Sequence, residues 1–175
     1  MNLGDINGST PLHDACDNGH IDIVNSLLKC NSSVNLCDIN GSTPLHLACI
    51  EGYKGIVDIF IKLNVDINLR GGRGEHTPIQ YACLKGHTDI VKLLLDNNCD
   101  VIDNNGFSPA LHSACEGGSV DIVDLLLRNK YNINQCQIVR KLGEKKKQTF
   151  DYMMYIHIYV LHSLFIRQIT VKVYC

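Results

Sequence analysis

The sequence predicts an all-α solenoid of four stacked helix pairs with short β-hairpin fingers, followed by a non-repeat C-terminal tail. Two observations predict this class. A seven-residue string that begins at Asn7 recurs 33 residues later, beginning at Asn40. Apolar residues at helical spacing follow each copy, and weaker copies continue the pattern further along the chain. Because such short helices cannot bury their apolar faces alone, neighbouring copies are expected to stack.

The repeated string reads N-G-S-T-P-L-H, with weaker forms at 77–80 and 108–112. Each copy precedes an Ala-Cys pair, and a glycine lies four residues after that alanine. The alanines are Ala15, Ala48, Ala82 and Ala114, and the glycines are Gly19, Gly52, Gly86 and Gly118. The repeats therefore span about residues 5–37, 38–70, 71–102 and 103–136, and residues 137–175 form the tail.

Each element of the repeat has a local chemical reason, which repeat one illustrates. The Asn-Gly pair supplies the positive-φ positions of a tight turn. Thr10 suits the N-cap of a helix, and Pro11 suits its first position, where a missing N–H costs nothing. Gly19 ends this first helix in a left-handed cap. A second helix is expected through residues 23–28, where aliphatic residues return at helical spacing.

This pattern resembles the ankyrin repeat, whose signature is T-P-L-H-x-A in a unit of 33 residues, over about residues 5–136. The resemblance implies a hairpin and two antiparallel helices per repeat, with a partner protein bound along the hairpin tips and the concave helix face. It also implies that the histidine of T-P-L-H is structural and forms hydrogen bonds near the threonine. Two departures stand out: a long Gly-rich finger at 70–76, and a short fourth finger followed by an inserted Ala110. The insertion predicts a distorted first turn in the fourth repeat.

The first repeat keeps the apolar face of an internal repeat. Leu12, Ala15, Ile23 and Leu27 form this face, whereas a terminal repeat needs a polar outer surface. We therefore expect the chain to be a monomer or part of a longer repeat array.

Charge and cysteine content restrict the classes of partner and the cellular locations that we expect. Residues 1–136 hold 9 Lys and Arg against 16 Asp and Glu, whereas residues 137–175 hold 7 against 2. The acidic repeat region argues against nucleic acid as a partner, because phosphate binding needs clustered basic residues.

The nine cysteines are odd in number, and no apolar signal segment begins the chain. Reduced thiols and a cytoplasmic or nuclear location are expected.

Three His-x-x-Cys pairs raise the question of a metal site. They are His13 with Cys16, His46 with Cys49, and His112 with Cys115. Successive pairs in a stack lie about 8–10 Å apart, whereas zinc–ligand bonds are about 2.0–2.3 Å long. Gln80 also replaces the histidine in the third repeat. No metal and no cofactor are therefore predicted.

No catalytic motif is found. The Gly-rich finger lacks the strand–loop–helix context and the Lys-Ser/Thr of a phosphate loop. The sequence also contains no nucleophile elbow or kinase string. We expect a non-catalytic protein–protein interaction scaffold or adaptor that binds another protein.

The expected contact residues follow from the register of the fingers and inner helices. They are Ile39, Asn40, Ser42, Ile50, Glu51, Arg73, His76, Leu84, Lys85, Asn104, Asn105, Phe107 and Glu116. Among them Ile50 and Phe107 are apolar at positions expected to face solvent, where an anchor would be useful. A lone exposed apolar residue is also ordinary on protein surfaces.

The tail leaves alternatives open. Its apolar run at residues 152–166 lies within the segment 150–166 that would hold a membrane-tethered adaptor. This run is shorter than the ~20 residues of a spanning helix, which disfavours a membrane anchor. The alternating Ile169, Val171 and Val173 favour a strand-rich cap. The abrupt change in composition favours a segment that is not native, such as a read-through or misassigned exon. Two other functions remain as alternatives: a fragment of a larger ankyrin-bearing kinase, methyltransferase or channel, and a membrane-tethered adaptor.

Overall fold

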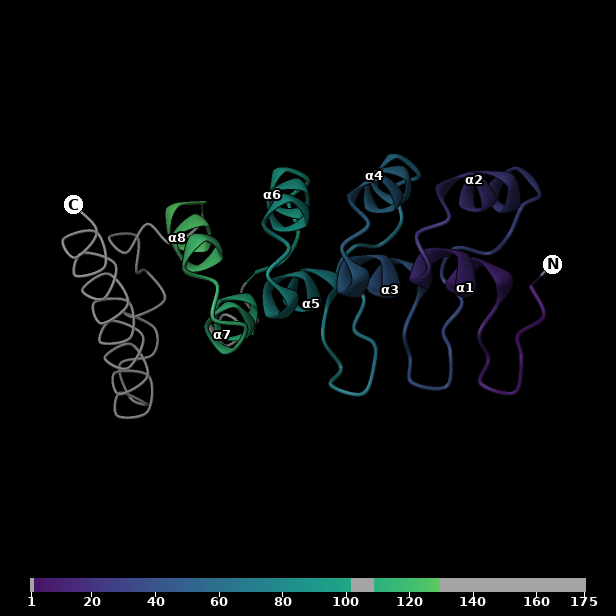
Figure 1. The fold of residues 1–175 in the computed structure, drawn as a ribbon, viewed down its shortest axis with the longest axis horizontal. Coiled ribbons are helices and arrows are strands. Elements are labelled where there is room, and N and C mark those ends of the chain that lie inside the picture. The colour runs from purple at the N-terminus through teal and green to yellow at the C-terminus, as the bar shows by residue number, and fades with distance from the viewer. Residues whose placement is uncertain (1, 102–108, 130–175) are drawn as a thin grey trace, which may run out of the picture. The chain divides into compact units, whose positions relative to one another are not determined.

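The computed structural model describes residues 2–101 and 109–129, and within these ranges the chain forms eight helices (Figure 1). They are α1 (Pro11–Asp17), α2 (Ile21–Lys29), α3 (Pro44–Glu51), α4 (Lys54–Lys62), α5 (Pro78–Lys85), α6 (Thr88–Asp96), α7 (Pro109–Glu116) and α8 (Val120–Asn129). The chain divides into two compact units, Met1–Ile122 and Val123–Cys175. The arrangement described below is that of the first unit. The predicted all-α repeat solenoid is confirmed.

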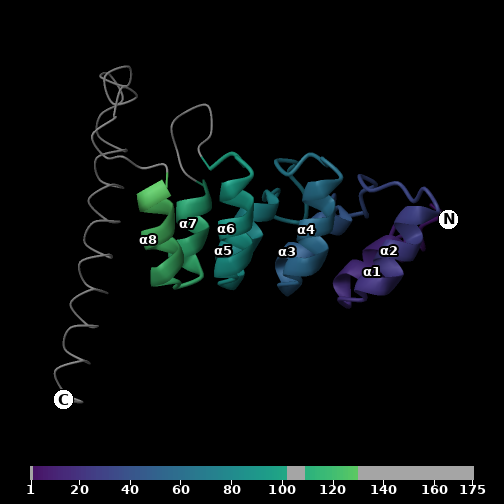
Figure 2. The ribbon, with the colours of Figure 1, turned by 90° about the horizontal axis from the view of Figure 1, so that it is seen from above.

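The helices of the first unit form two rows. The inner helices α1, α3, α5 and α7 contact one another in succession, and the outer helices α2, α4 and α6 do the same (Figures 1 and 2). Each of the first three inner helices also contacts the outer helix that follows it in the chain. The loops that precede α1, α3 and α5 all project from the same side of the inner row (Figure 1). These loops are the fingers expected from the sequence.

The inner helices begin as the Thr-Pro pairs predict. Thr10, Thr43 and Thr77 are N-caps in extended conformation, and proline follows each of them at the first helical position. The backbone N–H of each threonine donates to the side chain of the residue three positions later, which satisfies a donor that the helix cannot use.

The helices end in left-handed residues that alternate between glycine and asparagine. The inner helices are followed by Gly19, Gly52, Gly86 and Gly118, all at positive φ. The outer helices α2, α4 and α6 are followed by Asn31, Asn64 and Asn98, with φ between 55° and 60°. Asparagine tolerates this conformation better than other non-glycine residues do, so the repeat carries two chain reversals at fixed positions.

The core lies between the two helix rows and between successive repeats. Alanine and cysteine side chains from the inner helices are fully covered there, including Ala48, Cys49, Ala82 and Cys83. Aliphatic and aromatic side chains from the outer helices fill the rest, with Phe60 the largest of them. Leu12 and Ala15 of repeat one are also buried, so these two members of the predicted uncovered face need no further cover.

The inserted Ala110 changes the phase of α7. This helix starts at Pro109 and has eight residues, as do α3 and α5, so the predicted distortion of its first turn is not observed. Leu111 occupies the buried third position that His46 fills in α3, and His112 is exposed. One residue on a helix corresponds to a rotation of about 100°, which explains why the histidine is exposed in α7 while the leucine stays buried.

Several predictions concern residues outside the described ranges. These are the tail at 137–175, with its alternative structures, and the fourth finger. In the part of the chain that the structure describes, none of the helices is long and apolar enough to cross a membrane.

Candidate binding surface

The first two fingers are closed by an aspartate at the same repeat position. In finger one, Asp5 Oδ1 accepts the backbone N–H groups of Asn7 (2.8 Å) and Ser9 (2.9 Å). In finger two, Asp38 Oδ1 accepts those of Asn40 and Ser42, both at 2.8 Å. Each carboxylate thus satisfies two backbone donors of its own turn. The two fingers share one geometry.

The third finger is closed differently, because Gly71 stands where the aspartate would be. Here the backbone N–H of Gly71 donates to the carbonyl of His76, and the N–H of His76 donates back, both at 3.0 Å. The pair forms an isolated antiparallel bridge. The extra residue of this finger is accommodated at Glu75, whose φ is 49°.

The fingers are bonded to one another as well as to their own helices. The backbone N–H of Ile39 donates to the Asn7 carbonyl at 2.9 Å, which joins fingers one and two. Arg73 Nε donates to Asn40 Oδ1 at 3.3 Å, which joins fingers two and three. A Cβ at Gly71 would overlap the Gly41 carbonyl oxygen, so the second and third fingers approach through a glycine. Fingers one, two and three therefore form one continuous row, which we call the finger row.

Two isoleucines stand out at equivalent positions of this row. Ile6 is 97% exposed and Ile39 is 69% exposed. Leu3 and Leu36, which also share a repeat position, are exposed beside them in the sequence. Ile39 was expected from the sequence, whereas Ile6 and Leu3 were missed. The 33-residue register that relates Ile39 to Ile6 was the signal that could have identified Ile6.

The remaining finger residues of the expected set fall into three groups. Asn40 and Arg73 are exposed and lie together through their hydrogen bond, and His76 is half-buried. The expectation that Ser42 contacts a partner is wrong, because its side chain is buried. Its carbonyl accepts from His13 of the preceding repeat, which draws the residue into the stack. Asn104, Asn105 and Phe107 lie outside the described residues.

The second part of the expected set lies in the last turns of the inner helices. Glu51, Lys85 and Glu116 are exposed, and Ile50 and Leu84 are half-buried. In α3 these positions are at the opposite end of the helix from the finger, separated by a rise of about 10 Å. The structure therefore does not gather the expected residues into one patch but divides them between the fingers and the helix ends.

The histidines of the T-P-L-H strings lie beneath the fingers. His46 Nδ1 accepts the Thr43 backbone N–H at 3.1 Å, and its Nε2 donates to the Leu69 carbonyl at 3.0 Å. His13 repeats this arrangement with Thr10 and the Ser42 carbonyl. Burial lowers the pKa of His46, with backbone hydrogen bonds and Asp38 acting in the opposite direction. Both ring nitrogens are engaged, which leaves neither free to bind a metal.

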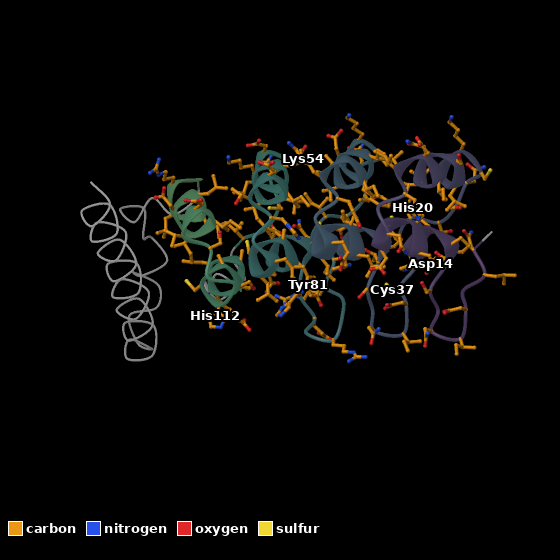
Figure 3. All side chains as sticks on the ribbon, in the orientation of Figure 1. Asp14, His20, Cys37, Lys54, Tyr81 and His112 are labelled. Carbon is orange, nitrogen blue, oxygen red and sulfur yellow. The ribbon has the colours of Figure 1, made fainter. Side chains whose placement is uncertain are left out.

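Gln80 replaces this histidine in repeat three, and its side chain forms hydrogen bonds with residues of its own repeat. Its Oε1 accepts the Thr77 backbone N–H at 2.9 Å, so its Nε2 is oriented to donate to His76 Nδ1 at 3.2 Å. The Tyr81 ring lies edge-on to His76, with ring centroids 5.3 Å apart, and its hydroxyl donates to the Gly71 carbonyl at 3.2 Å. Tyr81 lies at the base of the third finger (Figure 3).

The buried thiols are not activated. Burial raises the pKa of Cys16 to about 12, with Asp17 adding to the effect, and burial also raises the pKa values of Cys49 and Cys83. A protonated thiol is a poor nucleophile and a poor metal ligand. Among residues 2–101 and 109–129, no group of three His, Cys, Asp or Glu side chains is arranged to hold a metal ion.

Comparison with known families agrees with this geometry. A sequence model described as ankyrin repeats (3 copies) matches residues 1–71 and 70–137. No curated protein matches the chain.

Proposed function

The chain belongs to the ankyrin-repeat family, and from that premise we propose that it is a non-catalytic scaffold that binds a partner protein along its finger row. Ankyrin repeats are in general protein–protein interaction modules. Fold alone does not determine function, so the proposal rests on the exposed side chains of the fingers.

The observation that carries the proposal is the pair Ile6 and Ile39. Both are large apolar side chains that point into solvent from turns held by an aspartate and bonded to each other. A rigid turn loses little conformational entropy when a partner covers it, and an apolar anchor at the centre of a contact supplies much of its free energy. Together they form a two-point apolar anchor.

Polar groups around the anchor support specificity for a partner. Asn7 and Asn40 are exposed on the same two fingers, and the Arg73 guanidinium lies beside Asn40. Arginine is favoured in interfaces because it offers several donors and a delocalised charge. A carboxylate or backbone carbonyl of the partner would fit next to Arg73.

The inner-helix ends form a second part of the proposed surface. Glu51, Lys85 and Glu116 offer exposed charges there, with Ile50 and Leu84 partly covered between them. A partner long enough to cross from the fingers to these ends would contact both groups.

Partner capture with matched variants tests the proposal. The double variant Ile6→Asp with Ile39→Asp places charge on both tips without touching a buried side chain. We expect a partner captured by the wild type to bind it at least about tenfold more weakly. Leu63→Asp is the matched control, because Leu63 is also exposed and apolar but lies at the end of α4. Its binding should equal that of the wild type.

Circular dichroism and thermal unfolding of all three proteins establish that the folds are the same. Wild-type affinity in the double variant would contradict the proposed anchor. Equal weakening by Leu63→Asp would point to a general effect of added negative charge.

A further inference from the structure

The finger row changes in character between its second and third fingers. The 33-residue register places Ile6, Ile39 and Gly72 at equivalent positions of the three tips. A Cβ at Gly72 would overlap the Tyr81 hydroxyl, and φ there is 73°, so finger three has no room for an isoleucine. The next residue, Arg73, is exposed instead. The row therefore presents two apolar side chains followed by a basic one.

The exposure of the apolar tips belongs to their position in the finger. Ile39 has a finger on each side, because its own N–H bonds to finger one and the adjacent Asn40 bonds to finger three. It is nevertheless 69% exposed. An apolar side chain that stays in water on a turn held from both sides is a candidate contact for a partner.

Arg73 carries a charge that the repeats leave without a counter-ion. Its Nε donates to Asn40 Oδ1 at 3.3 Å, which holds the guanidinium beside finger two. Among residues 2–101 and 109–129, no carboxylate forms an ion pair with Arg73 or with Arg70 of the same finger. Arg128 is paired, by contrast, with Asp124. The outer nitrogens of Arg73 are therefore available to a carboxylate, which arginine binds through two parallel hydrogen bonds.

The spacing of the fingers selects a conformation for the bound segment. Stacked helices lie about 8–10 Å apart, and the bonds between the fingers keep their tips in step with the helices. A polyproline II segment returns to the same face every three residues, or about 9.3 Å. A β-strand does so after about 6.6 or 13 Å, and an α-helix after seven residues and about 10.5 Å. Only the polyproline II period falls within the finger spacing.

Polar groups at the same spacing suit the backbone of such a segment. A polyproline II segment has no internal hydrogen bonds, so its carbonyls need donors. Asn7 Nδ2 donates to Asp5 Oδ2 at 3.5 Å, and Asn40 Nδ2 donates to Asp38 Oδ2 at 3.4 Å. An amide has two protons, so each of these exposed asparagines can also donate to a carbonyl of the partner.

We propose that the partner segment on the finger row is a polyproline II segment with two apolar residues three positions apart and an acidic residue one turn further on. The apolar residues cover Ile6 and Ile39, and the carboxylate bonds to Arg73. This inference rests on the proposed function of the finger row and adds the chemical class of its partner. A phosphate fits less well, because proteins hold its larger charge with clusters of arginines, and Glu75 is exposed on the same finger.

Peptide titration of the full chain, followed through its amide chemical shifts, tests the proposal. The probe is the peptide PPLPPLPPEPP, and PPEPPLPPLPP covers the opposite chain direction. We expect saturable shifts at the amides of Ile39 and Arg73 with one of the two. The peptide PPLPPPLPPPEPP, with its leucines four apart, should bind at least about tenfold more weakly, because its leucines face different sides. Absence of binding in both directions, or equal binding of the wider spacing, would overturn the proposal.

A double-mutant cycle tests the carboxylate contact. Arg73→Gln should weaken binding of the glutamate peptide about tenfold, as should glutamine in place of the peptide's glutamate. The two changes together should cost little more than either alone, because they remove the same bond. Lys85→Gln is the matched control, since it removes an exposed positive charge of the same repeat at the end of α5. An equal loss from Lys85→Gln would indicate general charge attraction and contradict the contact.

A peptide with phosphoserine in place of glutamate distinguishes the other anion. We expect it to bind no more tightly than the glutamate peptide. Tighter binding that Arg73→Gln removes would assign the site to a phosphate and overturn the proposal. Failure of all peptides, while Ile6→Asp with Ile39→Asp still weakens a captured partner, would overturn this inference and leave the finger-row proposal standing.

Discussion

His46 links the start of α3 to the chain that enters the third finger through one imidazole ring. Its Nδ1 accepts from the helix N-cap, and its Nε2 donates to the carbonyl of Leu69, immediately before that finger. This pair of bonds requires a ring that carries one proton, on Nε2. A second proton would remove the acceptor at Nδ1 inside a site without water access.

The stability of the protein should therefore depend on pH through His46. Burial lowers its pKa from 6.5 in the folded state, so the unfolded chain binds more protons in mild acid. The contribution is fully present above the unfolded pKa of 6.5. It is lost as pH falls from there towards the lower folded pKa.

Urea unfolding of the wild type and of His46→Gln, measured from pH 8 down to about pH 5, checks this expectation. Glutamine is the residue that repeat three uses at this position. The free energy of unfolding of the variant should fall less over this range than that of the wild type. Parallel curves for the two proteins would show that His46 is not the titrating group.

At the scale of single elements, α7 shows how a one-residue insertion is accommodated. Ala110 shifts the helix phase, and two glycines follow α7 where α3 has one. Gly118 provides the left-handed turn, with φ of 70°. A Cβ at Gly117 would overlap the Leu84 carbonyl oxygen and lie 2.8 Å from that of Cys83, so the turn approaches the backbone of α5.

Gly117→Ala should therefore destabilise the protein by about 2 kcal/mol, because the obstructing atoms are backbone and cannot rotate away. Gly118→Asn is the matched control, since nothing lies within 4 Å of a Cβ there and asparagine tolerates positive φ. Its cost should stay below about 1 kcal/mol. Chemical denaturation measures both, and a smaller loss for Gly117→Ala than for Gly118→Asn would contradict the close approach.

At the scale of the whole molecule, stability comes from interfaces between successive repeats. Equivalent side chains differ in burial only because they have different neighbours, as Ile23 and Ile56 show. In such an array the free energy of unfolding is approximately a sum of repeat and nearest-neighbour contributions. The position of a residue along the stack then matters as much as its type.

The same substitution at these two sites measures that difference. Ile56→Ala should cost about 2–5 kcal/mol, the usual range for a buried isoleucine. Ile23→Ala should cost roughly half of that or less, because half of the side chain remains in water. Equal losses in urea denaturation would indicate that Ile23 is covered in solution.

The sequence alone determined the repeat unit, its helix starts and its chain reversals. Those features depend on interactions between residues a few positions apart, such as Thr10 with His13, and on the left-handed conformation of Gly52. The same short-range interactions form wherever the same residues recur, so a 33-residue period was enough to identify these features.

Only the tertiary structure decided which surface residues are accessible. Ser42 is buried although Asn40 beside it is exposed, because a histidine of the preceding repeat draws its carbonyl inwards. His112 is exposed although His46 is buried, because one inserted residue rotates the helix that carries it. Burial in a stack depends on the neighbouring repeat and on helix phase. The seven-residue string N-G-S-T-P-L-H specifies neither of them.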